Sequence, residues 1–190
     1  EPHFDNLFKL LEQLSDLSSQ LDNVEKERKA SFQTEARRLS RDVWELLMML
    51  PTNESLLNGF MKISTDQEVT QDEWNQLLPP NSPHRLYYSL QTVEFLAHGT
   101  KLGQKYMMRS GSGDASDDKK SAAVSKTPWC AKFISKGGLS HMMEIFMNGS
   151  LQCREGNIWS QWSQECLGYM LRLISQLSVD DPGHGEAEGC

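Results

Sequence analysis

The sequence lacks any long hydrophobic run. Its longest unbroken apolar stretch is Leu46 to Leu50, five residues, whereas a helix that spans a membrane needs about 20. We also expect no signal peptide, because the sequence from Glu1 onward has neither a charged nor an apolar leader pattern. We therefore expect no membrane partner, and we interpret the chain as an internal piece of a longer soluble protein.

A surplus of positive charge is missing too. The 190 residues include 19 Lys and Arg against 26 Asp and Glu, which gives a net charge of −7. A protein that binds nucleic acid needs clustered Lys and Arg in excess to neutralise phosphates. The composition therefore argues against a nucleic-acid partner.

Cysteines are few and lack the spacing of a metal site. No CxxC pair occurs, and four cysteines without a leader favour reduced thiols. We therefore expect a cytoplasmic location, with the nucleus as the second candidate. The cysteines are Cys130, Cys153, Cys166 and Cys190.

The motifs of common enzyme classes are absent as well. The chain contains no HExxH, no P-loop, no GxGxxG and no calcium-loop spacing, so we expect no metal and no cofactor. Cys153 and His141 are the only candidates for a thiol nucleophile with a base, and neither lies on a recognisable catalytic motif. A small enzyme is therefore the least supported hypothesis.

Helical periodicity is present almost everywhere. Apolar residues recur at spacings of three and four, and no alternating pattern predicts a strand. The charged stretch from Glu25 to Lys29 is expected to separate the first two helices. The pattern predicts about eight helices, near residues 4–21, 32–50, 53–63, 70–78, 82–98, 127–136, 139–147 and 159–179.

Sharp stop and start signals divide these helices. Pro51 ends the second helix, Thr70 with Glu73 forms a capping box, and Gly137-Gly138 is a turn that lets two helices meet closely. The fold class is all-α, and uneven helix lengths favour an irregular armadillo- or HEAT-like stack over the alternative, a compact helical bundle. We expect one helical segment over residues 1–179, with a disordered insertion at about 110–126. We expect residues 180–190 to form a disordered acidic tail.

Two groups of residues are candidate partner contacts. Arg37, Arg38 and Arg41 form a basic cluster that an acidic partner could contact, although a solvated helix face is the commoner role. Trp159 and Trp162 could line a partner groove, although aromatic residues at helical spacing more often belong to a core. Catalytic residues are not assigned.

Three segments in order carry a resemblance to a known family. They run from Val43 to Asn53, from Arg85 to Glu94 and from Lys132 to Leu139, and they contain a Leu-Pro-Thr stop, a Leu-Tyr-Tyr-Ser-Leu helix and a Phe-x-x-x-Gly-Gly-Leu turn. This order resembles the non-catalytic helical region of the very large ubiquitin-specific proteases of the fat-facets type. The resemblance covers roughly residues 38–177.

The resemblance implies a non-catalytic role for this chain. The family's catalytic unit has an asparagine-cysteine-tyrosine box and a histidine box, and neither is present here. We therefore expect a scaffold or protein-interaction segment of a large thiol-dependent deubiquitinase, with substrates, adaptors, neighbouring repeats or ubiquitin as protein partners. The alternative is a free-standing helical-repeat adaptor that binds a protein or peptide along one face.

Overall fold

The regular secondary structure in the described part of the chain is all helical. The computed structural model describes residues 2–19, 26–65, 68–98, 128–149, 151 and 160–178, and no strand occurs among them. The all-α prediction is confirmed. The eight helices of these residues are α1 (Pro2–Ser19), α2 (Lys26–Met49), α3 (Glu54–Lys62), α4 (Gln71–Leu77), α5 (Pro83–His98), α7 (Pro128–Ser135), α8 (Gly138–Met147) and α9 (Gln161–Ser178).

Local signals in the sequence set several helix ends. The side chain of Thr70 accepts a hydrogen bond from the backbone N–H of Glu73, whose carboxylate accepts one in return from the N–H of Thr70, so the predicted capping box is confirmed. Asn53 caps α3 by accepting a hydrogen bond from the N–H of Leu56 at 3.0 Å. Gly137 precedes α8 with a φ of 90°, which glycine adopts without strain.

The start of α2 differs from the prediction. The charged stretch was expected to separate two helices, but α2 already begins at Lys26. Lys, Glu and Arg are good helix formers, so this stretch needs no buried face to be helical. The insertion predicted at 110–126 and the tail predicted at 180–190 lie outside the described residues.

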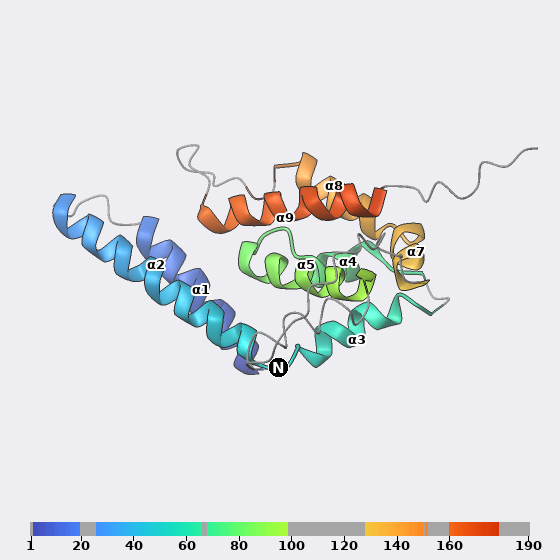
Figure 1. Cartoon of the computed structure of the whole chain (residues 1–190), viewed down its shortest axis with the longest axis horizontal. Coiled ribbons are helices and arrows are strands. Elements are labelled where there is room, and N and C mark those ends of the chain that lie inside the picture. The colour runs from blue at the N-terminus through green and yellow to red at the C-terminus, as the bar shows by residue number, and fades with distance from the viewer. Residues whose placement is uncertain are drawn as a thin grey trace, which may run out of the picture.

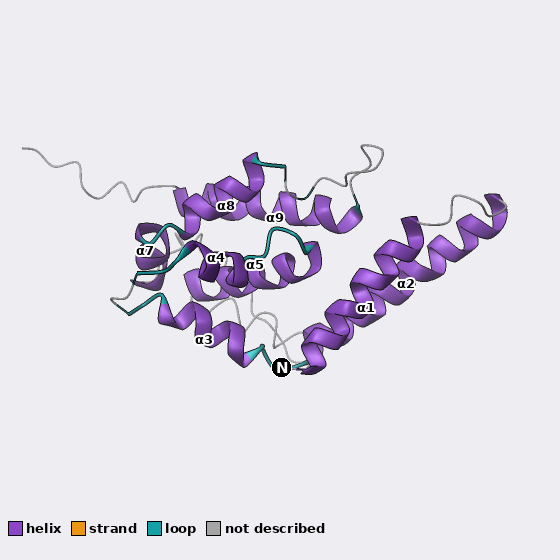
Figure 2. Ribbon diagram, turned by 180° about the vertical axis from the view of Figure 1, so that it is seen from behind, coloured by secondary structure: helices purple, strands orange, loops and turns teal. Residues whose placement is uncertain are grey.

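The helices form a stack of unequal pairs rather than one aligned bundle. The α1–α2 hairpin projects at an angle from the remaining helices in Figures 1 and 2. Helices α5 and α9 lie side by side and run in the same direction, because Pro83 contacts Cys166 while Glu94 contacts Arg172. An irregular helical stack therefore describes the arrangement better than a four-helix bundle does.

Two hydrophobic cores hold the stack together. The larger core joins α3, α4, α5, α7, α8 and α9, and the smaller one joins α1 and α2 to Tyr88 of α5. The apolar row that the sequence predicts along the last helix is buried in the larger core. Its members are Cys166, Met170, Leu173 and Leu177.

Candidate functional site

The described thiols are placed as structural groups. Cys130 and Cys166 are both in the thiol form, outside any disulfide, and both are fully buried. The Cys166 thiol donates a hydrogen bond to the carbonyl of Pro83 at 2.9 Å, and burial raises its pKa to about 12. A thiol in this state is not a nucleophile at neutral pH, because the reactive form is the thiolate. Cys153 and Cys190 lie outside the described residues.

Slow alkylation of these two thiols is an expected result. In the native chain, Cys130 and Cys166 should react with iodoacetamide far more slowly than in the unfolded chain, because burial blocks access to both thiols and also raises the pKa of Cys166. Mass spectrometry of proteolytic peptides measures the labelling at each cysteine. The same chain in denaturant is the control, and equal labelling of Cys166 in both states would contradict its structural role.

His141 joins two helices and is engaged on both ring nitrogens. Its Nδ1 lies 3.0 Å from the side-chain nitrogen of Gln71, and its Nε2 lies 3.3 Å from the carbonyl of Leu78. The ring also stacks on Trp74, with 6.2 Å between the ring centres. These contacts give His141 a structural role between α4 and α8. The hypothetical pairing with Cys153 lies outside the described residues.

Acidic and metal-binding side chains do not converge in the described part of the chain. Within these residues, no three His, Cys, Asp or Glu side chains lie close enough to hold a metal ion.

None of the described helices has the length and apolar character that a membrane crossing requires.

The three arginines predicted as a contact cluster are exposed on α2. Arg37, Arg38 and Arg41 all face solvent, and the guanidinium of Arg38 lies 3.9 Å from the carboxylate of Glu35. Their spacings of three and four residues place all three within about 100° of the helix circumference, on one exposed side. Their role as partner contacts stays a prediction.

Trp162 lies at the joint between the hairpin and the rest of the stack. Its ring is half-buried, with its centre 4.8 Å from the ring centres of both Trp44 and His84. The indole N–H of Trp162 donates to the hydroxyl of Ser40 at 3.3 Å. Much of the Trp162 side-chain surface is therefore buried by contacts within the chain. Its predicted companion, Trp159, lies outside the described residues.

Polar contacts fix the same joint from the side of α1. The guanidinium of Arg85 lies 3.0 Å from the carboxylate of Asp5 and also covers the ring of Phe8 at 4.9 Å. The hydroxyl of Ser82 donates to the carboxylate of Glu12 at 2.7 Å. The hairpin is thereby held against the start of α5 by both charged and apolar contacts.

An ionic cluster around a buried carboxylate, which the sequence analysis did not predict, joins α5 to α9. The Glu94 carboxylate is almost fully buried and accepts hydrogen bonds from the guanidinium of Arg172, at 2.9 and 3.1 Å, and from the hydroxyl of Tyr169. Arg172 also lies over the Tyr169 ring at 4.3 Å. No local pattern reveals this cluster, because Glu94 lies more than 70 residues before Tyr169 and Arg172 in the sequence.

A groove with an apolar floor lies between α1, α3, α4 and α5. Its volume is about 440 Å³. The floor consists of Phe8, Leu56, Ile63, Leu77 and Tyr88, and the charged rim consists of Asp5, Lys62, Glu68, Glu73 and Arg85. An apolar floor inside a rim that carries both charges is suited to a segment of another protein.

Comparison with known proteins identifies long enzymes as relatives. The chain is 36% identical to human ubiquitin carboxyl-terminal hydrolase 34 and 35% identical to the mouse protein of that name. Each alignment runs over 191 residues and covers 95% of this chain. It is also 32% identical over 114 residues to ubiquitin carboxyl-terminal hydrolase puf of Drosophila melanogaster, which covers 50% of this chain. No family model and no solved structure matches the chain.

The match occupies a small part of each relative. The chain spans 5% of the length of the human and mouse proteins and 3% of the Drosophila protein. The alignment nevertheless runs along nearly the whole chain, well beyond the three motifs that carried the resemblance. By sequence, the chain belongs with the large ubiquitin carboxyl-terminal hydrolases, of which it matches one short segment, and the predicted family is confirmed.

Proposed function

We propose that the chain is a non-catalytic scaffold and protein-interaction segment of a large thiol-dependent deubiquitinase. The observation that carries the proposal is the match of nearly the whole chain to one-twentieth of the length of ubiquitin carboxyl-terminal hydrolases. A segment of this size is one unit of a longer enzyme, and its role follows from what its own residues can do.

The chemistry of the described residues supports a catalytic unit elsewhere in the parent enzyme. A thiol protease needs an accessible cysteine whose thiolate is stabilised by a nearby base. Cys166 has the opposite environment, since it is buried, donates to a carbonyl and has a raised pKa. His141 is engaged on both nitrogens by Gln71 and Leu78. These residues stabilise the fold instead of supplying a nucleophile and a base.

The surface offers contacts for protein partners. The groove between α1, α3, α4 and α5 has an apolar floor and a charged rim, and we assign substrates or adaptors of the parent enzyme to it. Arg37 and Arg41 add an exposed basic pair for an acidic partner. Reduced thiols at Cys130 and Cys166 support a cytoplasmic location, with the nucleus as second candidate.

An activity-based ubiquitin probe tests the proposal directly. Ubiquitin that carries an electrophile at its C-terminus should form no covalent adduct with this chain under conditions where it labels the catalytic domain of a related hydrolase completely. The physical reason is that both described thiols are buried and that burial raises the pKa of Cys166. Intact-mass spectrometry measures the adduct, and the unreacted chain serves as the baseline.

A covalent adduct with native chain at any of its four cysteines would overturn the proposal. Removing the corresponding segment from a full-length relative provides the complementary measurement. The truncated enzyme should still hydrolyse a minimal fluorogenic ubiquitin substrate, while its capture of ubiquitinated protein substrates should fall. Loss of the minimal activity in a truncated enzyme that is otherwise folded would place catalytic function in this segment.

A further inference from the structure

An apolar stripe runs along the exposed surface of α2. Phe32, Leu39 and Leu46 follow one another at intervals of seven residues, and they are 45%, 47% and 50% exposed. Residues seven apart on a helix lie on one side, at the spacing by which helices pair with other helices. On α1, Leu10 and Leu17 repeat the same interval and are also exposed.

Both stripes border the seam of the hairpin on its outer face. Around α2, Trp44 and Ser40 face α9 and α5, the buried Val43 and Ala36 come next, and the stripe follows beyond them. Around α1, the order is the same: residues that contact α5, then buried residues, then Leu10 and Leu17. The outer face therefore carries one continuous apolar strip from two adjacent helices.

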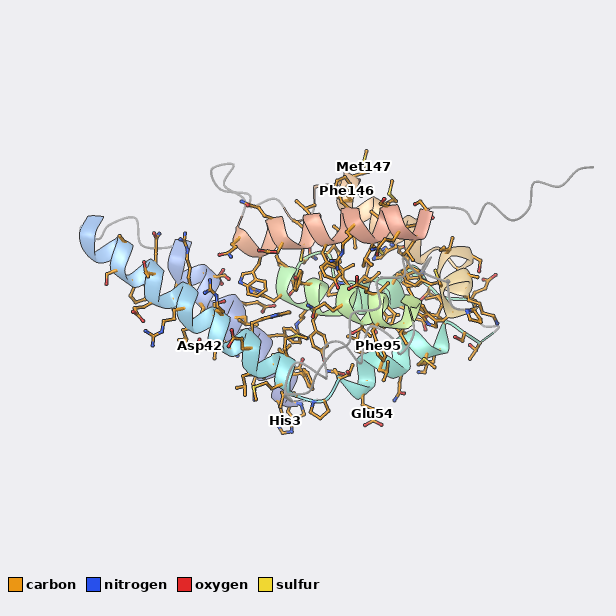
Figure 3. The ribbon with its side chains drawn as sticks, in the orientation of Figure 1. His3, Asp42, Glu54, Phe95, Phe146 and Met147 are labelled. Carbon is orange, nitrogen blue, oxygen red and sulfur yellow. The ribbon has the colours of Figure 1, made fainter. Side chains whose placement is uncertain are left out.

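The charged residues beside the strip can pair with the same residues of a second copy of the chain. Arg38 and Asp42 lie four residues apart, on the same side of α2, and Figure 3 shows Asp42 on the side that is turned away from α5 and α9. If the outer faces of two α2 helices approach in antiparallel orientation, around a twofold axis that crosses the helix at the level of residue 40, Arg38 of each copy lies beside the partner's Asp42. The weak contact of Arg38 with Glu35, at 3.9 Å on an exposed surface, leaves Arg38 available for this exchange.

The size of the outer face is sufficient for association. Helix α2 has 24 residues, which makes it about 36 Å long, and two adjacent helices are about 20 Å wide. This face can bury about 600 Å² per copy, close to the lower limit of a standard protein–protein interface. We propose that the outer face of the α1–α2 hairpin is the interface between two copies of this chain, which pack as an antiparallel four-helix arrangement.

Sedimentation of the full 190-residue chain tests the interface. The wild-type chain should change from monomer to dimer as its concentration rises through the micromolar range. The double substitution Leu39→Glu with Leu46→Glu should weaken dimerisation by about 100-fold or more, because it places four acidic groups in the apolar strip. Both positions are exposed within one chain, and circular dichroism should show unchanged helix content.

Met48→Glu is the matched control. Met48 is 44% exposed on the same helix, but it lies on the side opposite the stripe, so the dimer should be unaffected. Arg38→Asp alone should weaken the dimer, and Arg38→Asp combined with Asp42→Arg should restore it, since the twofold axis pairs the exchanged charges again. A wild-type chain that remains monomeric at several hundred micromolar would overturn the proposal. The proposal would also fail if that monomer bound an unrelated amphipathic helix on the outer face. A dimer that the two glutamates leave intact would also overturn it.

Discussion

Gly138→Ala is expected to lower the free energy of unfolding by about 2–3 kcal/mol. A Cβ atom at this position would lie 2.5–2.7 Å from three ring atoms of Phe133, which is far inside van der Waals contact. The Phe133 ring cannot move aside, because it is fully buried, stacks on Trp129 at 5.0 Å and meets Trp74 edge-on at 5.5 Å. Equilibrium unfolding in urea measures the change.

Gly168→Ala is the control for this substitution. Gly168 lies within α9, and a Cβ atom there would meet nothing within 4 Å. The same chemical change should therefore stabilise the chain by about 0.5–1 kcal/mol, through the higher helix propensity of alanine. Adding Phe133→Leu to Gly138→Ala should recover part of the loss, because the smaller side chain leaves room for the new methyl group. Equal effects of the two alanines would refute the close approach at Gly138.

Acid is expected to destabilise the chain through His84. This side chain is 2% exposed between α1 and α9, and burial lowers its pKa from 6.5 to about 4. Between pH 6.5 and 4 the unfolded chain therefore binds a proton at this residue that the native chain does not. The stabilising contribution of a neutral His84 is fully present above pH 6.5 and is lost as the pH falls to 4. The free energy of unfolding lost in this way by pH 4 is about 3 kcal/mol.

His84→Gln isolates this effect from the titration of the carboxylates. The variant cannot take up a proton at position 84, so its free energy of unfolding should fall less between pH 7 and pH 4 than that of the wild-type chain, by about 3 kcal/mol. Urea unfolding at a series of pH values measures both curves. Parallel curves for the two chains would show that His84 has the same pKa in the native and the unfolded chain, contrary to the effect expected from its burial between Ser15 and Trp162.

Local features of the fold could be predicted because their causes are local. The capping box at Thr70, the cap at Asn53 and the glycine turn at Gly137 each depend on residues within a few positions. The number of helices and the buried row of α9 follow in the same way from periodicity. The start of α2 could not be predicted, because a charged stretch is compatible with both a linker and an exposed helix.

The candidate sites were predicted less well because they depend on contacts between distant residues. The Glu94 cluster, the groove and the joint at Trp162 each join helices that lie far apart in the sequence. The sequence shows that Trp162 belongs to an apolar pattern, but not that its indole N–H reaches Ser40, 122 residues away. Aromatic and charged residues therefore gave candidates whose surroundings only the tertiary structure revealed.

The sequence by itself determined the all-α class, the helix ends with clear caps and the family, because these depend on local chemistry or on the order of motifs. The tertiary structure decided which apolar positions are covered. The pattern of α2 places Phe32, Ala36, Leu39, Val43 and Leu46 on one side, yet only Ala36 and Val43 of these are buried. A helix shows its apolar stripe in its own sequence, but the width that becomes buried depends on the partners that pack against it.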